Sequence, residues 1–489
     1  MKIKKYLNKY YKNILINNNH EVSLITDNSN YVIENSIFVA IKGYNYNGIS
    51  FVEEVINKGA KTIIYQNNDL KCFDFMRYPK INFIMVNNTK IELARLLNFF
   101  NFKKIKAKII GITGTNGKTT ISTNVYNCLK LLNKSVLLLG TEGNFIFYNN
   151  KENFIKTVNT TSSITDIYHL MIKYLFDYIV MEVSSQGIEE LRVLGIKYDI
   201  IAFSNITQDH LDYHKTIDNY VNSKSKLVYS LKEDGILILN KDMNYFDNIS
   251  KLVINQIYTY SVTTLDSNCY GKICDNFIDS MEIEINYNGK KYDLITKLLG
   301  DFNLENLLST ATILLALEIK IDKVINLLEK LTPVKGRMNL FLLDWSYVIV
   351  DFAHTPDGVK QVLNYVNKVK KGRVITILGC GGNKDKVKRP IMGKIATLNS
   401  DIVIFTEDNS RNEKTIDIIS EMISKVTTKN YYIECDRQKA IDLALSLKEV
   451  DDIILLLGKG NESFIIRDEK IAFSDIDYVI NLGGVRLNE

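Results

Sequence analysis

Hydrophobic runs separated by polar segments predict three successive parts of the chain. In the first part, short apolar runs at residues 37–40 and 61–65 predict strands, and the amphipathic stretch 91–100 predicts a helix. The basic stretch 103–106 then reads as a hinge before the next strand. This mixture predicts an N-terminal α/β domain over residues 1–104.

From Ala107 onward the pattern becomes strand, loop and helix. Residues 109–113 predict a short buried strand, and residues 119–132 predict the helix that follows it. Further apolar strands are predicted at 135–139, 178–182, 199–203 and 236–239. Alternation of this kind predicts a mostly parallel sheet with helices on both faces. We assign this central domain to residues 105–332.

A second alternating set of elements follows Pro333. The predicted strands are 347–350, 374–378, 402–405, 431–434 and 453–457, and helices at 357–368 and 412–424 would connect some of them. This pattern is typical of a separate doubly wound, Rossmann-like domain, here residues 333–489. The predicted fold class is therefore α/β with three domains.

Composition is compatible with this picture. The chain has 489 residues, and a prior of about 150 residues per domain also gives about three domains. Hydrophobic residues make up 46% and charged residues 24%, which is typical of a globular protein. The net charge of +5 is small for this length. It does not by itself indicate a nucleic-acid partner, although it suits an anionic substrate.

Cysteine usage and the chain start bear on the compartment. The six cysteines form no CxxC pair, which predicts reduced thiols; they are Cys72, Cys128, Cys269, Cys274, Cys380 and Cys435. The basic start leads into a Tyr/Asn-rich stretch, so no signal peptide is predicted. No apolar run approaches the roughly 20 residues that span a bilayer. We therefore expect a cytoplasmic protein without a transmembrane segment.

The segment GITGTNGKTT at residues 111–120 carries the clearest chemistry. It follows a predicted strand and opens a predicted helix, which is the context of a phosphate-binding loop. Its glycines let backbone N–H groups point at phosphates, Lys118 supplies a cation, and Thr119 can place its hydroxyl on Mg²⁺. The residues predicted to bind ATP here are Gly114, Thr115, Asn116, Gly117, Lys118, Thr119 and Thr120. The loop alone leaves a kinase, a motor and a ligase open.

Longer motifs in a fixed order resemble the Mur ligase family, to which folylpolyglutamate synthetases are similar. These motifs are GTNGKTT at 114–120, NTT at 159–161, MEVSS at 181–185, FSNIT at 203–207 and DHLDYH at 209–214. Three further regions resemble the MurE branch, the UDP-N-acetylmuramoyl-tripeptide synthetases. They are NSN at 28–30 with IFVA at 37–40 and Gly43, GGNKD at 381–385 with KRP at 388–390, and DNSR at 408–411 with GKGNE at 458–462.

The resemblance implies ATP-dependent amide-bond formation in peptidoglycan synthesis. ATP would phosphorylate a carboxylate of a UDP-linked muramyl dipeptide, and the amine of an incoming amino acid would then displace phosphate. The protein's main work in such a reaction is positioning and charge neutralisation. The resemblance also implies ATP and Mg²⁺ as cofactors, small-molecule substrates, no nucleic-acid partner and a monomer.

Roles in the chemistry are carried over by resemblance. The implied catalytic residues are Lys118, Lys224, Glu182 and His210, and the implied metal contacts are Thr119, Glu182, His210 and Lys224. Lys224 would be carbamylated to N6-carboxylysine, which turns a cation into an anion that can support a second Mg²⁺. Lys226 is a competing candidate, but the spacing from Asp209-His210 favours Lys224. Asn306, Arg337 and Asp351 match positions that contact adenine, phosphate and ribose.

The residues implied to bind the UDP-linked substrate share short hydroxyl or amide groups or a guanidinium. They are Ser29, Asn45, Asn159, Thr160, Thr161, Ser184 and Arg192. Hydroxyl and amide donors suit uridine and diphosphate oxygens, although such residues also serve as turn and capping residues. The NTT motif at 159–161 is the firmest part of this set.

Arg411 bears on which amino acid is added. Family members that add meso-diaminopimelate carry Asp-Asn-Pro-Arg at this place, and those that add lysine usually lack the Arg. A guanidinium can clamp the second carboxylate of diaminopimelate, which lysine lacks, and Glu462 would hold its distal ammonium. The implied amino-acid pocket is Lys384, Asp408, Asn409, Ser410, Arg411, Gly458 and Glu462.

Several positions depart from the family pattern. Ser410 stands where Pro is usual, Lys384 where Arg is usual, and Asn461 where His is usual; Gln186 likewise replaces His, and Asn28 and Asn30 replace Asp and Arg. Diaminopimelate remains favoured, with lysine, ornithine and lanthionine as alternatives. Two other hypotheses stay open: a different amide ligase of the family, and a non-catalytic ATP-binding paralogue.

Overall fold

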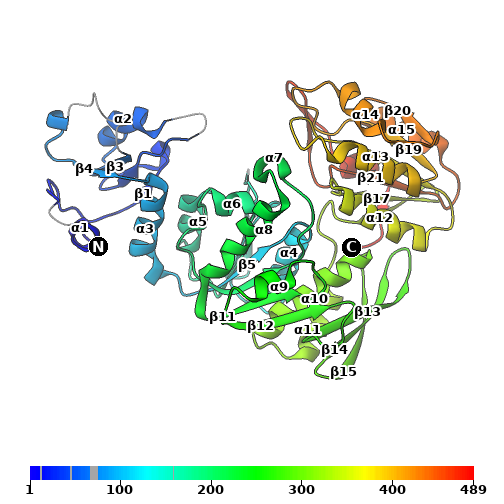
Figure 1. Cartoon of the computed structure of the whole chain (residues 1–489), viewed down its shortest axis with the longest axis horizontal. Coiled ribbons are helices and arrows are strands. Elements are labelled where there is room, and N and C mark those ends of the chain that lie inside the picture. The colour runs from blue at the N-terminus through cyan, green and yellow to red at the C-terminus, as the bar shows by residue number, and fades with distance from the viewer. Residues whose placement is uncertain (12–13, 44–46, 67–74, 158) are drawn as a thin grey trace. The chain divides into compact units, whose positions relative to one another are not determined.

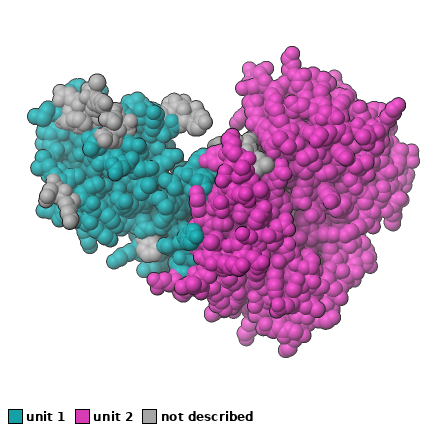
Figure 2. Space-filling model, viewed as in Figure 1, with its two compact units in different colours: residues 1–111, 133–199, 229–232 teal, residues 112–132, 200–228, 233–489 magenta. Residues whose placement is uncertain are grey.

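The computed structural model describes residues 1–489 except 12–13, 44–46, 67–74 and 158. Asn45 and Cys72, both singled out above, lie outside the described residues. The described chain divides into two compact units (Figure 2). The first unit comprises residues 1–111, 133–199 and 229–232, and the second comprises 112–132, 200–228 and 233–489.

The first unit begins with a four-stranded parallel sheet in the order β1-β2-β3-β4 (Figure 1). Its elements are α1 (Ile3–Tyr10), β1 (Ile25–Thr26), β2 (Ile37–Val39), α2 (Val52–Asn57), β3 (Thr62–Gln66), β4 (Asn82–Val86) and α3 (Thr89–Asn101). Apolar side chains of β2, β3 and α2, including Phe38, Ile63 and Val55, form its core. The two strands and the helix predicted in this region are confirmed, with ends within about two residues.

The largest sheet has eleven strands in the order β15-β14-β13-β12-β11-β10-β5-β9-β6-β7-β8. Its strands are β5 (Lys108–Thr113), β6 (Val136–Gly140), β7 (Gly143–Tyr148), β8 (Lys151–Ile155), β9 (Tyr178–Glu182), β10 (Tyr198–Phe203), β11 (Leu231–Asn240), β12 (Gln256–Ser261), β13 (Cys269–Asn276), β14 (Met281–Tyr287) and β15 (Lys290–Thr296). The predicted strands correspond to β5, β6, β9, β10 and β11. Residues of β7, β8 and β13–β15 form antiparallel pairs that the sequence interpretation did not anticipate.

Helices connect and cover these strands. They are α4 (Lys118–Leu131), α5 (Ile164–Met171), α6 (Ser185–Glu189), α7 (Leu211–His214), α8 (Ile217–Ser225), α9 (Phe246–Ser250), α10 (Asp301–Ala316) and α11 (Ile321–Glu329). Helix α10 packs against α4 and against β12 and β13. It is buried on almost every side, as its Leu- and Ala-rich sequence requires. The helix that begins at the phosphate loop is therefore held by a second, fully buried helix.

The last part of the chain forms a seven-stranded sheet in the order β20-β19-β18-β21-β17-β16-β24. Its elements are β16 (Asn339–Leu343), β17 (Ser346–Asp351), α12 (Pro356–Val369), β18 (Val374–Leu378), α13 (Lys388–Asn399), β19 (Ile402–Phe405), α14 (Thr415–Ile423), β20 (Tyr431–Ile433), α15 (Arg437–Leu447), β21 (Ile453–Leu457), α16 (Asp475–Asn481) and β24 (Val485–Arg486). The five strands from β20 to β17 pair in parallel. This confirms the predicted doubly wound arrangement.

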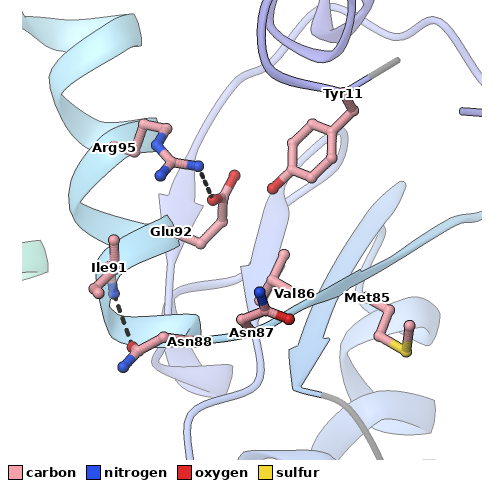
Figure 3. A pocket seen from close by; sticks show the side chains of 8 residues that line it. All are labelled: Tyr11, Met85, Val86, Asn87, Asn88, Ile91, Glu92 and Arg95. Carbon is pink, nitrogen blue, oxygen red and sulfur yellow. Dashed lines mark hydrogen bonds and ion pairs between the residues drawn. The ribbon is translucent and has the colours of Figure 1, made fainter. Parts of the chain in front are cut away.

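A small pocket lies in the first unit, where β4 ends and α3 begins (Figure 3). It has a volume of about 300 Å³. Its lining residues are Tyr11, Met85, Val86, Asn87, Asn88, Ile91, Glu92 and Arg95. The carboxylate of Glu92 is buried and accepts a hydrogen bond from Arg95 at 2.7 Å. No residue that we predicted to bind substrate lines this pocket.

Within the described ranges, none of the helices combines the length and the apolar character that crossing a membrane requires. The five cysteines in the described residues are free.

Candidate active site

The phosphate loop has the backbone geometry that its sequence predicts. It connects the end of β5 to the start of α4, and Gly117 caps the helix with φ of +85°. A Cβ atom on Gly114 would lie 1.9 Å from the Ser204 hydroxyl, and one on Gly117 would lie 2.3 Å from the Asn306 side-chain oxygen. Both positions therefore exclude a side chain. Thr119 and Thr120 follow, and both are buried.

A second segment braces the loop from the end of β10. Asn205 accepts a hydrogen bond from the Thr115 backbone at 2.8 Å with its carbonyl, and one from the Asn116 backbone at 2.9 Å with its side chain. The Ser204 hydroxyl donates to the Asn116 carbonyl at 2.5 Å. The sequence indicates this FSNIT segment only as a family motif. Its position directly after a strand that ends at the same sheet edge was the available signal.

Two lysine side chains converge on one carbonyl of the loop. Lys118 Nζ donates to the Gly114 carbonyl at 2.9 Å and to the Thr115 carbonyl at 2.8 Å. Lys224 Nζ, from α8, donates to the same Gly114 carbonyl at 2.8 Å. Lys224 is 1% exposed. Burial, together with the nearby charge of Lys118, lowers the pKa of Lys224 well below its ordinary value, against a smaller opposing effect of Asp209.

His210 lies next to an acidic side chain in the turn before α7. Its backbone adopts a left-handed conformation with φ of +53°, and its Nε2 lies 3.4 Å from Asp209 Oδ2. Burial would raise the pKa of Asp209, but the charges of His210, His354 and Lys388 hold it below its ordinary value. Asp209 therefore stays ionised and attracts cations. The imidazole of His210 is about half exposed.

Glu182 ends β9 in the first unit and is held by one residue that sequence reasoning missed. Its Oε1 accepts from the Thr141 backbone at 2.9 Å, and its Oε2 accepts from the Thr141 hydroxyl at 2.9 Å. Glu182 is 2% exposed. A Cβ on Gly140 would lie 2.4 Å from Glu182 Oε1, so this glycine makes room for the carboxylate. Thr141 follows β6, which pairs in parallel with β9.

Several predicted substrate-binding residues in the first unit are linked. The Thr161 hydroxyl contacts the Ser184 hydroxyl at 3.2 Å and accepts from the Ser184 backbone at 3.0 Å. Arg192 donates to the Thr161 carbonyl at 2.8 Å, and Thr160 accepts from Thr141 at 3.1 Å. Asn159 is exposed beside them. The structure thus brings the predicted NTT motif together with Ser184 and Arg192.

Ser29 is set apart from this group by its contacts. It opens a single 3₁₀ turn after β1, and its carbonyl accepts a hydrogen bond from Lys58 at 3.1 Å. No described contact links it to Thr161, Ser184 or Arg192.

The three predicted nucleotide contacts all lie in the second unit. Asn306 is 5% exposed on α10, with its amide oxygen against Gly117. Asp351 ends β17 and accepts backbone hydrogen bonds from Met338 at 2.9 Å and Ala353 at 2.7 Å. Burial raises its pKa, although the charge of Arg337 and these hydrogen bonds oppose that shift. The Arg337 guanidinium stacks 4.3 Å from the centre of the Phe352 ring.

Glu305, the neighbour of Asn306, is a further titratable group of this region. Burial raises its pKa to about 7, and the charges of Asp242 and Asp357 act in the same direction. The ionised form is therefore disfavoured in the folded protein. The only side chain in the described residues recorded as a hydrogen-bond donor to it is Asn240, at 3.1 Å.

Glu305→Gln is expected to stabilise the protein at pH 8 and to have little effect at pH 4. The pKa of Glu305 is higher in the folded protein than in the unfolded chain, so ionising Glu305 destabilises the folded protein. This loss of stability is absent below about pH 4.5 and complete above about pH 7. We expect a gain of about 1–2 kcal/mol at pH 8, measured as a shift of the urea midpoint. The exposed Glu329→Gln is the matched control. An equal gain at both pH values would contradict the assignment.

The predicted amino-acid pocket lies at the carboxyl ends of three neighbouring parallel strands. Loops 379–385, 406–411 and 458–462 follow β18, β19 and β21, which pair side by side. The first two loops touch, because the Gly382 backbone donates to the Asn409 carbonyl at 2.8 Å. A Cβ on Gly458, with φ of +106°, would lie 2.8 Å from Asp408 Oδ2. The structure therefore brings these three segments together, and their role as an amino-acid pocket stays a prediction.

Individual side chains of this pocket differ in how they are held. Arg411 has φ of +52°, and its NH1 donates to the carbonyls of Gly382 at 2.8 Å and Asn409 at 3.1 Å. Asp408, Asn409 and Ser410 are buried, whereas Lys384 is exposed. Glu462 accepts a hydrogen bond from Asn409 at 2.7 Å. The pocket thus contains one partly held guanidinium and two carboxylates.

The chemistry of the implied metal contacts fits Mg²⁺. A threonine hydroxyl and a carboxylate are hard oxygen donors, and Mg²⁺ keeps several waters and phosphate oxygens among its ligands. Within the residues that the structure describes, no group of three or more His, Cys, Asp or Glu side chains could hold a metal by itself.

Comparison with known proteins adds independent findings. A family model described as the Mur ligase middle domain matches residues 112–314, and one described as the Mur ligase, glutamate ligase domain matches residues 336–460. A UDP-N-acetylmuramoyl-L-alanyl-D-glutamate–2,6-diaminopimelate ligase of Clostridium tetani is 36% identical over 497 residues, covering 98% of each chain.

Solved structures agree with these matches. A structure of a UDP-N-acetylmuramoyl-L-alanyl-D-glutamate–2,6-diaminopimelate ligase aligns with a TM-score of 0.65 at 25% identity, covering 95% of each chain. The MurF ligase of Thermotoga maritima, solved in complex with ADP, aligns with a TM-score of 0.65 at 16% identity, covering 94% of this chain and 96% of its own. At 16% identity, the likeness to the MurF ligase shows a shared fold and nothing about function.

Proposed function

Because the chain belongs to the Mur ligase family, we propose that it is an ATP-dependent ligase of the MurE type. It joins a diamino acid, meso-2,6-diaminopimelate, to UDP-N-acetylmuramoyl-L-alanyl-D-glutamate in peptidoglycan synthesis. The observation that carries this choice is the group of loops that follows β18, β19 and β21. There Arg411 and Glu462 offer one positive and one negative group to a single distal end of a substrate.

The reaction has two displacement steps. The free carboxylate of the dipeptide attacks the γ-phosphorus of ATP, which forms an acyl phosphate and releases ADP. The amine of the amino acid then attacks the acyl carbon, which forms the amide and releases phosphate and a proton. Lys118 and the backbone N–H groups of the loop orient the phosphates and neutralise their charge. Asn306, Arg337 and Asp351 hold the remainder of the nucleotide.

Lys224 is the proposed site of carbamylation. Its lowered pKa favours the neutral amine, which is the form that adds CO₂. The product is a carbamate anion and one released proton, so a neutral buried amine is replaced by a negatively charged group. When bound, Mg²⁺ would supply charge neutralisation for the phosphate oxygens. Thr119, Glu182, His210 and the modified Lys224 are the residues that would hold it.

The UDP-linked substrate is assigned to the first unit. Asn159, Thr160, Thr161, Ser184 and Arg192 offer hydroxyl, amide and guanidinium donors. The hydrogen bonds of Thr161 with Ser184 and Arg192 support a common site. Ser29 and Asn45 are proposed for the uridine end, on the family resemblance alone. Arg192 is also paired with Glu190, at 3.0 Å, which fixes its orientation.

The proposed pocket would take lysine less well than diaminopimelate. A bidentate guanidinium–carboxylate pair needs the second carboxylate, which lysine and ornithine lack. Lanthionine carries that carboxylate and is the remaining alternative. Lanthionine has a thioether sulfur in place of the central methylene of diaminopimelate. Direct competition between the two amino acids for the enzyme would show which one it prefers.

The proposed chemistry also bears on where the enzyme acts. ATP and UDP-linked precursors are cytoplasmic compounds, so we assign the protein to the cytoplasm. That it is a monomer is proposed on the family resemblance alone. We also propose three domains: residues 1–104 for the UDP-linked substrate, 105–332 for ATP, and 333–489 for the amino acid.

Phosphate release by the purified protein tests the proposal. With ATP, Mg²⁺ and UDP-N-acetylmuramoyl-L-alanyl-D-glutamate, release is expected with diaminopimelate and much less with lysine. Release with lysine but not with diaminopimelate would overturn the choice of amino acid. Turnover only with a folate, or only with UDP-tripeptide and D-alanyl-D-alanine, would assign another family activity. Nucleotide binding without any turnover would indicate a non-catalytic paralogue.

A further inference from the structure

A fully buried lysine lies behind the proposed amino-acid pocket. Lys459 follows β21, between the two glycines of the GKGNE segment, and its side chain is 0% exposed. Its Nζ donates to Glu462 Oε2 at 2.9 Å and to the Phe464 carbonyl at 2.7 Å. Neither the family resemblance nor the sequence pattern had assigned it a role.

Asn409 completes the contacts around the same carboxylate. Its Nδ2 donates to Glu462 Oε2 at 2.7 Å, and its Oδ1 accepts from the Ile466 backbone at 2.8 Å. Lys459 Nζ lies 3.5 Å from that Oδ1. Within the described residues, the hydrogen bonds from Asn409 and Lys459 to the Glu462 side chain both reach Oε2. The Glu462 side chain is 30% exposed, so part of it remains accessible to a ligand.

Burial makes the charge of Lys459 consequential. An ammonium group removed from water is costly unless an anion and hydrogen-bond acceptors compensate it, and Glu462 is its one ion-pair partner among the described residues. Glu462 is thus already neutralised before a substrate arrives. A substrate such as lysine, whose distal end carries only an ammonium, would therefore be attracted less strongly by the Glu462 carboxylate, because this carboxylate already pairs with Lys459.

The charges around the pocket point the same way. The three loops carry the cations Lys384, Arg411 and Lys459 and the anions Asp385, Glu407, Asp408 and Glu462. A substrate end that carries both an ammonium and a carboxylate adds no net charge to this set. An end that carries only an ammonium adds a positive charge next to Glu462, whose carboxylate already pairs with the Lys459 cation.

We propose that Lys459 is a positioning and specificity-determining residue, which fixes Glu462 through Oε2 and biases the pocket toward an amino acid with a zwitterionic distal end. This rests on the proposed function of the pocket. Lys459 itself does not touch the substrate. It acts through Glu462, by holding the accessible carboxylate oxygen at a defined place and by moderating its charge.

Lys459→Met tests the proposal, because methionine nearly keeps the length of the side chain and removes its charge. We expect KM for diaminopimelate to rise about ten- to a hundredfold, with kcat lowered less than about threefold. KM for ATP and for the UDP-dipeptide should stay within about twofold. The preference for diaminopimelate over lysine should fall by about tenfold. The exposed Lys425→Met, in the same part of the chain, is the matched control.

A double-mutant cycle with Glu462→Gln separates positioning from a merely structural role. If Lys459 acts through Glu462, the effects of the two substitutions on KM for the amino acid are strongly non-additive. Additive effects, or an equal rise of KM for all three substrates, would overturn the proposal. Lys459→Gln keeps a donor for the Phe464 carbonyl and serves in place of the methionine variant if that variant does not fold.

The outcome is distinguishable from a failure of the proposed function. That function fails if the unmodified enzyme does not turn over diaminopimelate, whatever the variants do. If the unmodified enzyme turns over lysine instead, the cycle is measured with lysine. Coupling between Lys459 and Glu462 would then support the positioning role, and unchanged selectivity in Lys459→Met would overturn the specificity role.

Discussion

Lys224→Met is expected to lower kcat about a hundred- to a thousandfold, while nucleotide binding stays within about threefold. Lys224 is buried against the phosphate loop, and methionine fills nearly the same volume, so packing is largely kept. What is lost is the amine that can be carbamylated, and with it the anion proposed to support the second metal ion. Phosphate release and calorimetric nucleotide binding measure the two quantities separately.

Carbon dioxide gives the same hypothesis an independent readout. The unmodified enzyme should lose activity in CO₂-free buffer and regain it with bicarbonate, because the neutral amine adds CO₂ reversibly. Lys224→Met should not respond. Lys226→Met is the matched control, since this lysine is two residues away and exposed. Full activity of Lys224→Met would contradict the carbamylation of Lys224. If this variant regained activity with bicarbonate as the unmodified enzyme does, the bicarbonate effect would belong to another group.

Arg411→Met is expected to lower kcat/KM for diaminopimelate about 30- to 1,000-fold, corresponding to about 2–4 kcal/mol for one lost partner of a charge-assisted pair. The value for lysine should change less than about threefold, because lysine has no second carboxylate for the guanidinium to hold. Steady-state phosphate release with each amino acid measures both. The left-handed backbone of Arg411 costs methionine about as much as arginine, so strain should not confuse the result.

Arg411→Lys is the informative companion. It keeps the positive charge but cannot form the planar two-point contact, so we expect it to recover only part of the loss. Equal losses for both amino acids would show that Arg411 acts by holding the Gly382 loop, to which it donates a hydrogen bond, rather than by binding substrate.

The alternating core of the fold was predictable because its strands are short, apolar and bounded by polar loops. β9 and β18 fall on the predicted residues. The antiparallel strands β13–β15 were not anticipated, since their alternating residues bury one face only and carry many charges. In β14, Met281 and Ile283 are buried while Glu282 is exposed. These three strands are stabilised by pairing with one another, and none of them contains a motif that would have indicated their position.

The candidate site was predictable where a motif joins a strand end to a helix start, as at Lys118. It was not predictable where a side chain acts as a brace. Thr141 holds Glu182, and Asn205 holds the phosphate loop, through contacts across 41 and 89 residues of sequence. The sequence shows Lys459 only as part of the GKGNE motif. Its burial and its contact with Glu462, which suggest a role, are seen only in the structure. Long-range contacts of this kind depend on the register of strands that the local sequence does not encode.

The arrangement of the C-terminal sheet bears on how specificity can change over evolution. Asp351, proposed for the nucleotide, ends β17, whereas the residues proposed for the amino acid follow β18, β19 and β21. Each of the three loops proposed to bind the amino acid follows a different strand. Substitutions or insertions in these loops can therefore accumulate without altering β17, which carries the residue proposed to bind ATP. The hydrogen bond from the Gly458 backbone to the Asp351 carbonyl, at 3.1 Å, links the two sets through main-chain atoms. A lineage could therefore adopt a new stem-peptide residue while keeping its energy source intact.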